Sequence, residues 1–369
     1  APLAKSLEVN LASRYSDYST GAVATTNSKA SIFWAINDDI SVRSTYSQAF
    51  RAANIRELFA GQLPSFAAGI DPCKTLDDEG PLRPLTGAND AGCLQTGAPA
   101  SGFRDGLQSI RTNTGGNLNL KPETAKIKTF GLVYTPDWLP GFSLSSDYYD
   151  IQLEDTIATF DAVRKIELCN ENGSFCDDIH RYTSGPLQGV LLGVDTYNEN
   201  LNASHYQGID SEVHYAFNTA KMGSVSLGLT WHHALKHEVS IFDGLTTEYV
   251  GTHSSTGGFQ PENRFNFTAS WRYQDWNVGW ATFVTGELTT DGRKVDDVTP
   301  QYTLDTWSYS NLNVGYAAGD ALSYSFGLNN VFNEKPQLTM LTAGNTNSAA
   351  AYSQAFLGQT FFIRTKYAF

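Results

Sequence analysis

The connections between the strand-like segments of this chain alternate in length from one to the next. Five of them are short, and each short one is followed by a long one. In an antiparallel meander, successive connections lie at opposite ends of the sheet. The sequence therefore predicts a sheet with only tight turns at one end and large loops at the other. The short connections are 37–39, 136–141, 218–223, 273–275 and 317–320, and the long ones are 49–123, 152–203, 238–262, 287–301 and 333–355.

The segments between these connections alternate apolar and polar residues with a period of two, as strands with one apolar face do. In one of them Phe326 and Leu328 alternate with Ser325 and Gly327. We count about twelve such segments. They contain residues 7–12, 32–36, 40–45, 130–134, 142–148, 209–217, 225–231, 265–272, 276–280, 312–316, 322–329 and 357–369.

Membrane-spanning helices are excluded, because no run of eighteen apolar residues occurs. The chain has instead 21 Phe, 18 Tyr, 7 Trp and 32 Gly, with a mean hydropathy of −0.29. Soluble sandwiches do not sort their loops by length, whereas outer-membrane barrels have short periplasmic turns and long external loops. The fold class predicted is all-β, an antiparallel up-and-down transmembrane β-barrel in the bacterial outer membrane, in contact with its lipids.

The formal net charge of −13 argues against nucleic acid as a partner. Binding to phosphates needs clustered Lys and Arg, and the sequence contains no basic run. The acidity is typical of a solvated surface.

The last segment, FLGQTFFIRTKYAF, ends in an aromatic residue. Leu357, Phe361, Ile363, Tyr367 and Phe369 share one face of the expected strand. In bacterial outer membranes the barrel assembly machinery recognises a terminal aromatic of this kind. We therefore expect Tyr367 and Phe369 to form the assembly signal.

The four cysteines lie in two of the long connections. Cys73 and Cys93 are in 49–123, and Cys169 and Cys176 are in 152–203. Of the three possible connectivities, pairing within each loop is the simplest, and the periplasm would oxidise both pairs. A metal site is less favoured, because the segment CNENGSFC lacks ligand spacing and neighbouring histidines.

Six segments, taken together and in order, resemble the C-terminal barrel of TonB-dependent outer-membrane receptors, and the resemblance covers nearly the whole chain. One departure is Ala53, where the family usually has proline, and this change should leave the following short helix intact. The six segments are LASRYSDYS (11–19), YSQAFRAANIRELF (46–59), GNLNLKPETAKIKTFGLVY (116–134), SSDYYDIQLEDTI (145–157), YQGIDSEVHYAF (206–217) and SFGLNNVFNEKP (325–336).

The resemblance implies a 22-strand barrel with an N-terminal plug domain, preceded by a segment that contacts TonB. Residues 1–369 contain about twelve strands and no plug domain. We therefore interpret the chain as the C-terminal part of such a barrel. A complete twelve-stranded barrel is the alternative, since twelve strands can close.

The function that the resemblance implies is energy-coupled uptake of a scarce solute, such as a siderophore or an oligosaccharide, through the TonB complex. The alternative is a free-standing twelve-stranded channel, or a surface receptor without energised transport. No cofactor is expected. Ligand contacts are expected from aromatic and arginine residues of the long loops. These candidates are Phe66, Phe103, Arg104, Arg111, Arg181, Tyr182, Phe259 and Tyr352.

Enzymatic activity is not expected. Lipid hydrolases occur among twelve-stranded barrels, and His232 and His233 could pair with a serine. However, the sequence has neither a Gly-x-Ser-x-Gly elbow nor a His-Glu-x-x-His motif. Paired histidines at a strand end are typical of a solvated rim.

Overall fold

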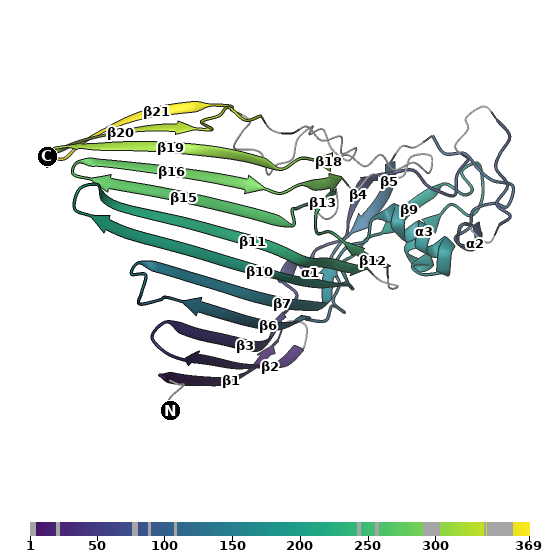
Figure 1. Ribbon diagram of the computed structural model, residues 1–369. Helices are drawn as coiled ribbons and strands as arrows, with labels where there is room; N and C mark the ends of the chain where they lie inside the picture. The colour runs from purple at the N-terminus through teal and green to yellow at the C-terminus, as the bar shows by residue number, and fades with distance from the viewer. Residues whose placement is uncertain are drawn as a thin grey trace.

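A computed structural model describes residues 5–19, 23–75, 80–87, 90–106, 109–241, 245–254, 258–290, 303–335, 337 and 357–369. Its main feature is a thirteen-stranded antiparallel sheet that curves like part of a barrel wall (Figure 1). Twelve of these strands follow one another across the sheet in chain order, and the short β12 (Leu245–Glu248) pairs with β11. Within the described ranges, no helix has the length and hydropathy needed to span a membrane.

The twelve strands in chain order form what we call the wall, and each overlaps one of the alternating segments predicted from the sequence. The predicted all-β fold of about twelve antiparallel strands is therefore confirmed. The strands are β1 (Ser6–Tyr18), β2 (Val23–Ala35), β3 (Ile40–Arg51), β6 (Glu123–Tyr134), β7 (Phe142–Ala158), β10 (Glu199–Thr219), β11 (Gly223–Ile241), β15 (Asn263–Tyr273), β16 (Trp276–Thr285), β19 (Trp307–Ala318), β20 (Leu322–Asn329) and β21 (Thr360–Tyr367).

The sheet does not close on itself. Among the described strands, β1 pairs only with β2, and β21 pairs only with β20, so both are edge strands. Exposed edges leave one row of backbone hydrogen-bonding groups unpaired, which a hydrocarbon layer does not tolerate. In the part of the chain that the structure describes, the sheet is thus open at both edges.

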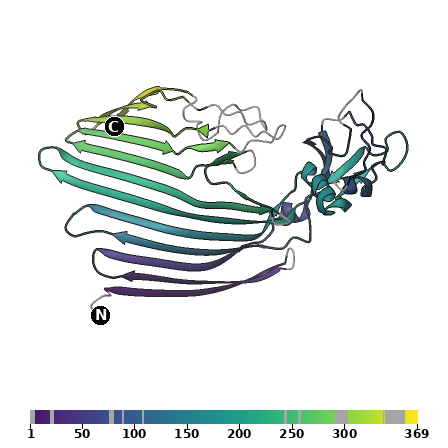
Figure 2. The same cartoon turned by 45° about the vertical axis from the view of Figure 1, so that its right-hand side comes forward.

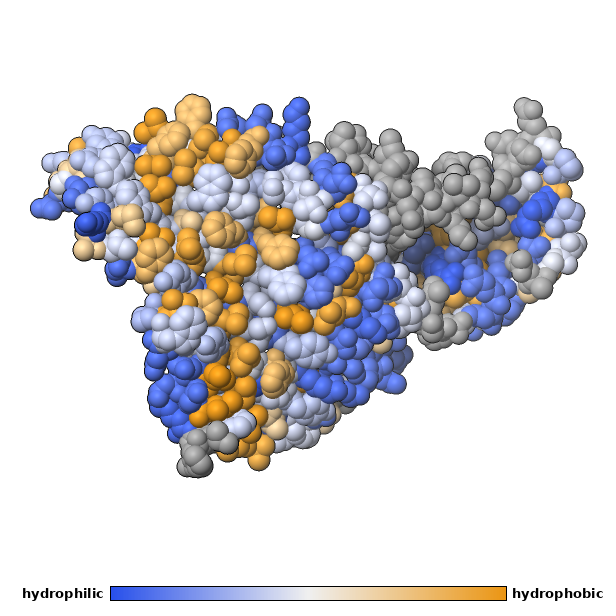
Figure 3. Space-filling model, in the orientation of Figure 1, coloured by the Kyte–Doolittle hydropathy of each residue, from blue (hydrophilic) through white to orange (hydrophobic). Residues whose placement is uncertain are grey.

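One face of the wall is apolar from edge to edge, because the strand register places apolar residues beside apolar residues. Phe326 pairs with Val314 on one side and Ile363 on the other, and Leu229 pairs with Phe267. Figure 3 shows the result as a band of hydrophobic side chains that crosses the sheet from β21 to β1. Ile363, Leu229 and Phe267 are all exposed, so no described residue covers the apolar face at these positions.

The other face, which we call the polar face, carries the alternate residues of the same strands. Asn277 pairs with Gly315, and Ser270 pairs with Gly279, so small and polar side chains cover much of it. The two faces thus differ as the lipid and lumen faces of membrane barrels do.

The connections sort to the two ends as predicted, with one exception. Tight turns at 36–39, 135–141, 220–222, 274–275 and 319–321 lie at one end of the wall, where both termini also lie (Figure 1). The described parts of the large loops lie at the other end. The exception is at β1 and β2, where the paired residues Tyr18 and Val23 lie at the long-loop end although only four residues separate them in sequence.

Specific residues close the tight turns. The side chain of Asn37 accepts hydrogen bonds from the backbone N–H groups of Asp39 and Ile40, at 3.0 and 2.7 Å. Gly141 has φ 86°, and a Cβ there would lie 1.9 Å from the carbonyl oxygen of Ala216. Glycine is therefore the residue that allows this turn to pack against β10.

The first two large loops fold together into one unit, which we call the loop subdomain, and which projects from the long-loop end of the wall (Figures 1 and 2). Its four-stranded sheet has the order β4-β5-β9-β8, so strands of one loop pair with strands of the other. The first loop contributes α1 (Ile55–Phe59), β4 (Leu63–Ala68), α2 (Ala91–Gln95) and β5 (Ser109–Thr114), and the second contributes α3 (Ala162–Asn172), the 3-10 helix η2 (Cys176–Asp178), β8 (Ile179–Arg181) and β9 (Leu191–Asp195).

The helices of the loop subdomain have local capping signals. α1 begins with a capping box, in which the Asn54 side chain and the Glu57 side chain each bond the other's backbone N–H. α3 begins at the Asp161 cap and ends at Gly173, which has φ 78°. The Asn54, Glu57 and Asp161 side chains satisfy unpaired N–H groups at the helix starts, and Gly173 ends α3 through its left-handed backbone.

Both disulfides form within single loops, as expected, and they lie beside each other in the subdomain core. Cys73 bonds Cys93, and Cys169 bonds Cys176. The Asn170 side chain accepts a hydrogen bond of 2.7 Å from the backbone N–H of Cys93. The two loops therefore meet at their disulfides, and the buried residues around them form one hydrophobic core. This core contains Cys73, Leu85, Cys93, Ala98, Phe103, Ile110, Ala162, Ile166, Cys169, Cys176, Ile179, Leu191 and Val194.

A second small sheet, with the order β14-β13-β17-β18, lies at the same end of the wall beside β15 to β19 (Figure 1). It also combines two loops, because β13 pairs in parallel with β17. Its strands are β13 (Thr252–Ser254), β14 (Gly258–Gln260), β17 (Leu288–Thr290) and β18 (Thr303–Leu304).

Asn330 directly follows β20 and stabilises the turn in which the chain passes β19. It is 1% exposed and has φ 51°. Its side chain accepts from the backbone N–H of Glu334 and donates to the carbonyl oxygen of the same residue, both at 2.8 Å, while its own N–H donates to Asn311. Asparagine suits this position because it tolerates a left-handed backbone.

Replacing Asn330 by alanine should lower the free energy of unfolding by about 1 to 2 kcal/mol, since the two hydrogen bonds that its buried side chain makes to Glu334 are lost. Guanidinium unfolding of the complete protein in detergent would measure this. Glycine at the same position loses the same bonds but accommodates the positive φ, so it should cost less than alanine. Equal unfolding free energies for wild type and alanine variant would contradict the role of this side chain.

Candidate binding site on the polar face

A row of charged residues crosses the polar face at one level of the sheet. In register, Arg43 of β3 pairs with Gly131 of β6, which pairs with Asp147 of β7. The row continues through Asp210, His232 and Arg264 on β10, β11 and β15. Six neighbouring strands thus bring these residues together, although they are more than 200 positions apart in sequence.

Gly131 allows the first ion pair of this row to form across an intervening strand. The Arg43 Nε donates to Asp147 Oδ1 at 2.8 Å, and a second guanidinium nitrogen contacts the other carboxylate oxygen. A Cβ at Gly131 would lie 2.1 Å from Asp147 Oδ1. Any larger residue at this position would displace the pair.

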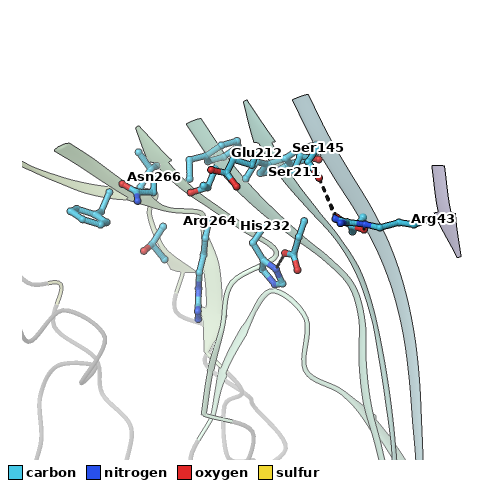
Figure 4. Close-up of a pocket in the computed structure, with 15 residues that line it drawn as sticks. Arg43, Ser145, Ser211, Glu212, His232, Arg264 and Asn266 are labelled. Atoms are coloured by element: carbon cyan, nitrogen blue, oxygen red, sulfur yellow. Dashed lines mark hydrogen bonds and ion pairs between the residues drawn. The ribbon is translucent and has the colours of Figure 1, made fainter. Parts of the chain in front are cut away.

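His232 and Arg264 lie side by side at the β15 end of the row. His232 Nδ1 lies 2.6 Å from Asp210 Oδ1, so the carboxylate orients the imidazole ring. Arg264 donates to the carbonyl oxygen of Phe259 at 3.1 Å, and its guanidinium lies 5.9 Å from the centre of that ring. Figure 4 shows both side chains extending in the same direction from β11 and β15.

Arg264 differs from the other arginine of the row because it forms no ion pair with any described residue, whereas Arg43 is held by Asp147. Its charge and most of its guanidinium donors are therefore open to a ligand. Glu212 of β10, two strands away, forms no ion pair with any described residue either and lies exposed on the same face (Figure 4).

These residues line a hollow of about 520 Å³. Concave sites of this size hold small molecules, with a few polar groups that fix orientation. The hollow offers a guanidinium, an imidazole, carboxylates and the Phe283 ring. It can therefore bind a polar solute with both charged and aromatic parts. Its lining residues are Arg43, Ser145, Asp147, Asp210, Ser211, Glu212, Thr230, Trp231, His232, Arg264, Phe265, Asn266, Phe283, Val284 and Thr285.

Of the ligand contacts predicted from the sequence, one adjoins this hollow. Phe259 packs against Arg264. Tyr352 lies outside the described residues. Arg264 itself was not predicted as a ligand contact, although its position in the sequence could have indicated this role. It occupies a polar-face position of an alternating strand directly after a long loop.

The other predicted contacts lie in the loop subdomain. Phe66 is 71% exposed on β4 and pairs in register with Arg111, while Tyr182 is 40% exposed. Arg104 is exposed and donates to the carbonyl oxygen of Gly80.

Phe103 and Arg181 are buried in the subdomain, where the guanidinium lies 5.6 Å from the ring centre. The two residues therefore contact each other inside the folded loops.

His232 and His233 point to opposite faces of β11, as neighbours in a strand do. His233 Nδ1 lies 3.0 Å from Asn263 Oδ1, on the apolar side. In the described structure neither histidine bonds a serine hydroxyl, so the serine–histidine pair considered from the sequence does not form here.

The family model for the TonB-dependent receptor-like β-barrel matches residues 2–331. No curated protein matches the chain. Among solved structures, the siderophore receptor PirA from Acinetobacter baumannii superposes with a TM-score of 0.62 at 17% identity, over 99% of this chain and 44% of that one. The ferric enterobactin receptor PfeA from Pseudomonas aeruginosa, solved as a Q482A mutant in complex with enterobactin, gives 0.61 at 15% identity, over 98% and 43%.

A more distant match is the iron transporter FrpB from Neisseria meningitidis, with a TM-score of 0.51 at 12% identity, over 94% of this chain and 40% of that one. At these identities the likeness shows a shared fold. The chain spans less than half the length of each of these receptors.

Proposed function

Because this chain belongs to the TonB-dependent receptor-like β-barrel family, we propose that it forms wall and external loops of an outer-membrane receptor for energy-coupled uptake. The observation that carries the proposal is the wall itself. Its twelve strands keep one apolar and one polar face, and the large loops lie at a single end. Such a wall suits a barrel that separates lipid from a polar lumen.

In this proposal the apolar face contacts outer-membrane lipid, and the long loops lie outside the cell. The barrel assembly machinery inserts the protein, with Tyr367 and Phe369 as its signal. A plug segment of the complete receptor contacts the TonB complex. The transported solute passes the hollow on the polar face, where Arg264 and His232 contact it. The family is a receptor and transporter class, which favours uptake over catalysis.

The solute is proposed to be an iron-loaded siderophore, which is the ligand class named for PirA and PfeA. The hollow fits an anionic, aromatic chelate because Arg264 offers a guanidinium without a carboxylate partner and Phe283 offers a ring. Bidentate guanidinium contacts are a strong means of holding anionic oxygens.

Uptake of radiolabelled ferric enterobactin by cells that express the complete protein, and lack other receptors for it, tests the proposal. Uptake should stop when the proton gradient is collapsed by an uncoupler or when TonB is deleted. Arg264→Ala should reduce binding at least about tenfold, the effect of one lost charged hydrogen bond. Arg272→Ala is the matched control, because Arg272 lies on the same face of β15 near the turn end.

Uptake that persists without TonB would favour the free-standing channel. Binding to cells or proteins without any uptake, across a panel of ferric siderophores, would favour a surface receptor. Either result would overturn energy-coupled transport.

A further inference from the structure

A second hollow, of about 670 Å³, lies at the root of the loop subdomain, where both large loops meet the start of β10. We call it the root cleft. It is separate from the hollow on the polar face of the wall and shares no lining residue with it. Its lining residues are Gln62, Gln95, Gly116, Asn117, Leu118, Asn119, Gly173, Phe175, Cys176, Asp177, Asp178, Tyr197 and Glu199.

The carboxylates of the root cleft are held by a buried lysine. Lys165 of α3 is 1% exposed, and its Nζ donates to Asp178 Oδ2 at 2.6 Å and to Glu199 Oε1 at 2.9 Å. This contact also ties α3 to the first residue of β10. Each carboxylate keeps its second oxygen, so both groups are fixed in orientation and still able to accept hydrogen bonds.

Side-chain amides supply the other polar groups. Gln62, Gln95 and Asn119 are exposed and make no side-chain hydrogen bond to any described residue. The same holds for the Asp177 carboxylate. An amide both donates and accepts, so these residues suit a ligand whose groups also do both.

Apolar surface lies between these polar groups. Phe175 has φ 63°, an uncommon backbone conformation for a bulky residue, and its ring is held against Phe160 with 5.1 Å between ring centres. Lys165 Nζ lies 4.9 Å from the centre of the Phe175 ring. Two further residues add apolar surface to the lining of the cleft. They are Leu118, which is 64% exposed, and Tyr197.

The negative charge of the root cleft limits which kinds of ligand can bind there. Asp177, Asp178 and Glu199 line it, and no Lys or Arg does. Anionic ligands, including the ferric chelates proposed for the wall, would be repelled. Within the described ranges, no cluster of three His, Cys, Asp or Glu residues could hold a metal ion. The exposed amides, which both donate and accept hydrogen bonds, favour a neutral molecule with many hydroxyl groups over a cation, which can only donate.

We propose that the root cleft binds a pyranose residue of a neutral oligosaccharide. Sugar hydroxyls donate to the fixed carboxylates of Asp178 and Glu199 and exchange hydrogen bonds with the amides. The C–H face of the sugar ring packs on the aromatic surface at Phe175. The proposal stands apart from the uptake function, since it concerns a different site and a ligand of different charge.

The test is binding of the purified complete protein to an array of immobilised neutral glucans, mannans and galactans, with sialylated and uronic-acid glycans beside them. We expect binding to at least one neutral glycan and to none of the acidic ones. The affinity of the free oligosaccharide would then be measured by calorimetry for wild type, Asp177→Ala and Asn119→Ala. Each variant should weaken binding about tenfold, as the loss of one well-made hydrogen bond does.

Glu171→Ala is the matched control, because Glu171 is an exposed carboxylate of α3 that lies outside the cleft. It should change the affinity less than twofold. Asp177 and Asn119 are chosen because neither contacts Lys165, so their replacement leaves the fold intact. Unchanged melting temperatures would establish this for each variant.

Two sources could supply such a sugar, namely a free saccharide and the sugar chain of a cell-surface lipopolysaccharide. Competition by purified lipopolysaccharide with and without its outer sugar chain separates them, and either source supports the proposal. Failure to bind any neutral glycan would overturn it. The proposal would also be overturned if a cationic peptide bound in a salt-sensitive way and displaced a glycan that itself binds only weakly. TonB-dependent uptake of ferric enterobactin tests the function proposed for the wall. Neither of these two negative results at the root cleft would change the outcome of that experiment.

Discussion

Replacing Arg181 by methionine is expected to destabilise the loop subdomain by about 3 to 5 kcal/mol while the wall stays folded. The Arg181 side chain is 0% exposed, and that of its partner Asp71 is 2% exposed. Removing one member of a buried ion pair leaves an uncompensated charge in a medium of low dielectric constant. This penalty is much larger than for a surface pair.

The other contacts of Arg181 add to the expected effect. Its Nε donates to Thr96 Oγ1 at 3.0 Å, and Nη1 donates to the carbonyl oxygen of Gly189 at 2.8 Å. Its Nη2 donates to Asp71 Oδ1 at 3.0 Å. Arg181 thus links residues of both large loops, and its loss would separate them. Lysine cannot reproduce this fork of donors, so Arg181→Lys should also destabilise.

Hydrogen exchange of the complete protein would measure the effect, because it resolves the loop subdomain from the wall. Exchange should accelerate in α2, α3 and β9 and stay unchanged in β15 and β16. The double variant Arg181→Met, Asp71→Leu removes both charges and should recover part of the stability. If the single variant exchanged at wild-type rates, the pair would not hold the two loops together.

Replacing Phe326 by lysine should cost about 2 to 4 kcal/mol, if its row lies near the middle of the bilayer. The side chain lies on the apolar face between Val314 and Ile363 and is 38% exposed. A lysine there would place an ammonium group in hydrocarbon, where no water can solvate it. The folded fraction in lipid vesicles across a denaturant series measures the change.

Ser325→Lys is the matched control, because Ser325 is the neighbour on the polar face of the same strand. Lysine there faces a polar lumen and should cost at most about 1 kcal/mol, the repulsion from Arg364 on the paired strand. If both variants lost the same stability, strand disruption rather than the lipid environment would explain the loss. If neither did, the apolar face would not be in contact with hydrocarbon.

The wall was predictable because strand signals are local. The alternation around Phe326 and Leu328 identifies both a strand and its apolar face, and the register of β20 with β19 and β21 bears this out. The disulfide partners were also predictable, since each pair lies within a single loop. Closure of the sheet is different, because no local pattern says which strands pair at the two edges of the wall.

The loops were less predictable. From the sequence, Phe103 and Arg181 were candidate ligand contacts, yet both are buried in the subdomain core. Nothing local distinguishes Arg181 from the exposed Arg111, because its partner Asp71 is 110 residues away. Lys165 likewise reads as an ordinary helix residue, although it orients two carboxylates of the root cleft.

The sequence by itself determined the strands, their apolar face, the sorting of turns and loops, and the pairing of cysteines. Each of these depends on neighbours in the chain, through the pleat of a strand or the closeness of two cysteines. Only the tertiary structure decided that two loops share one core, and that Arg43, Asp147, His232 and Arg264 stand in one row. Those arrangements depend on strand register and on contacts between segments far apart, which no local pattern records.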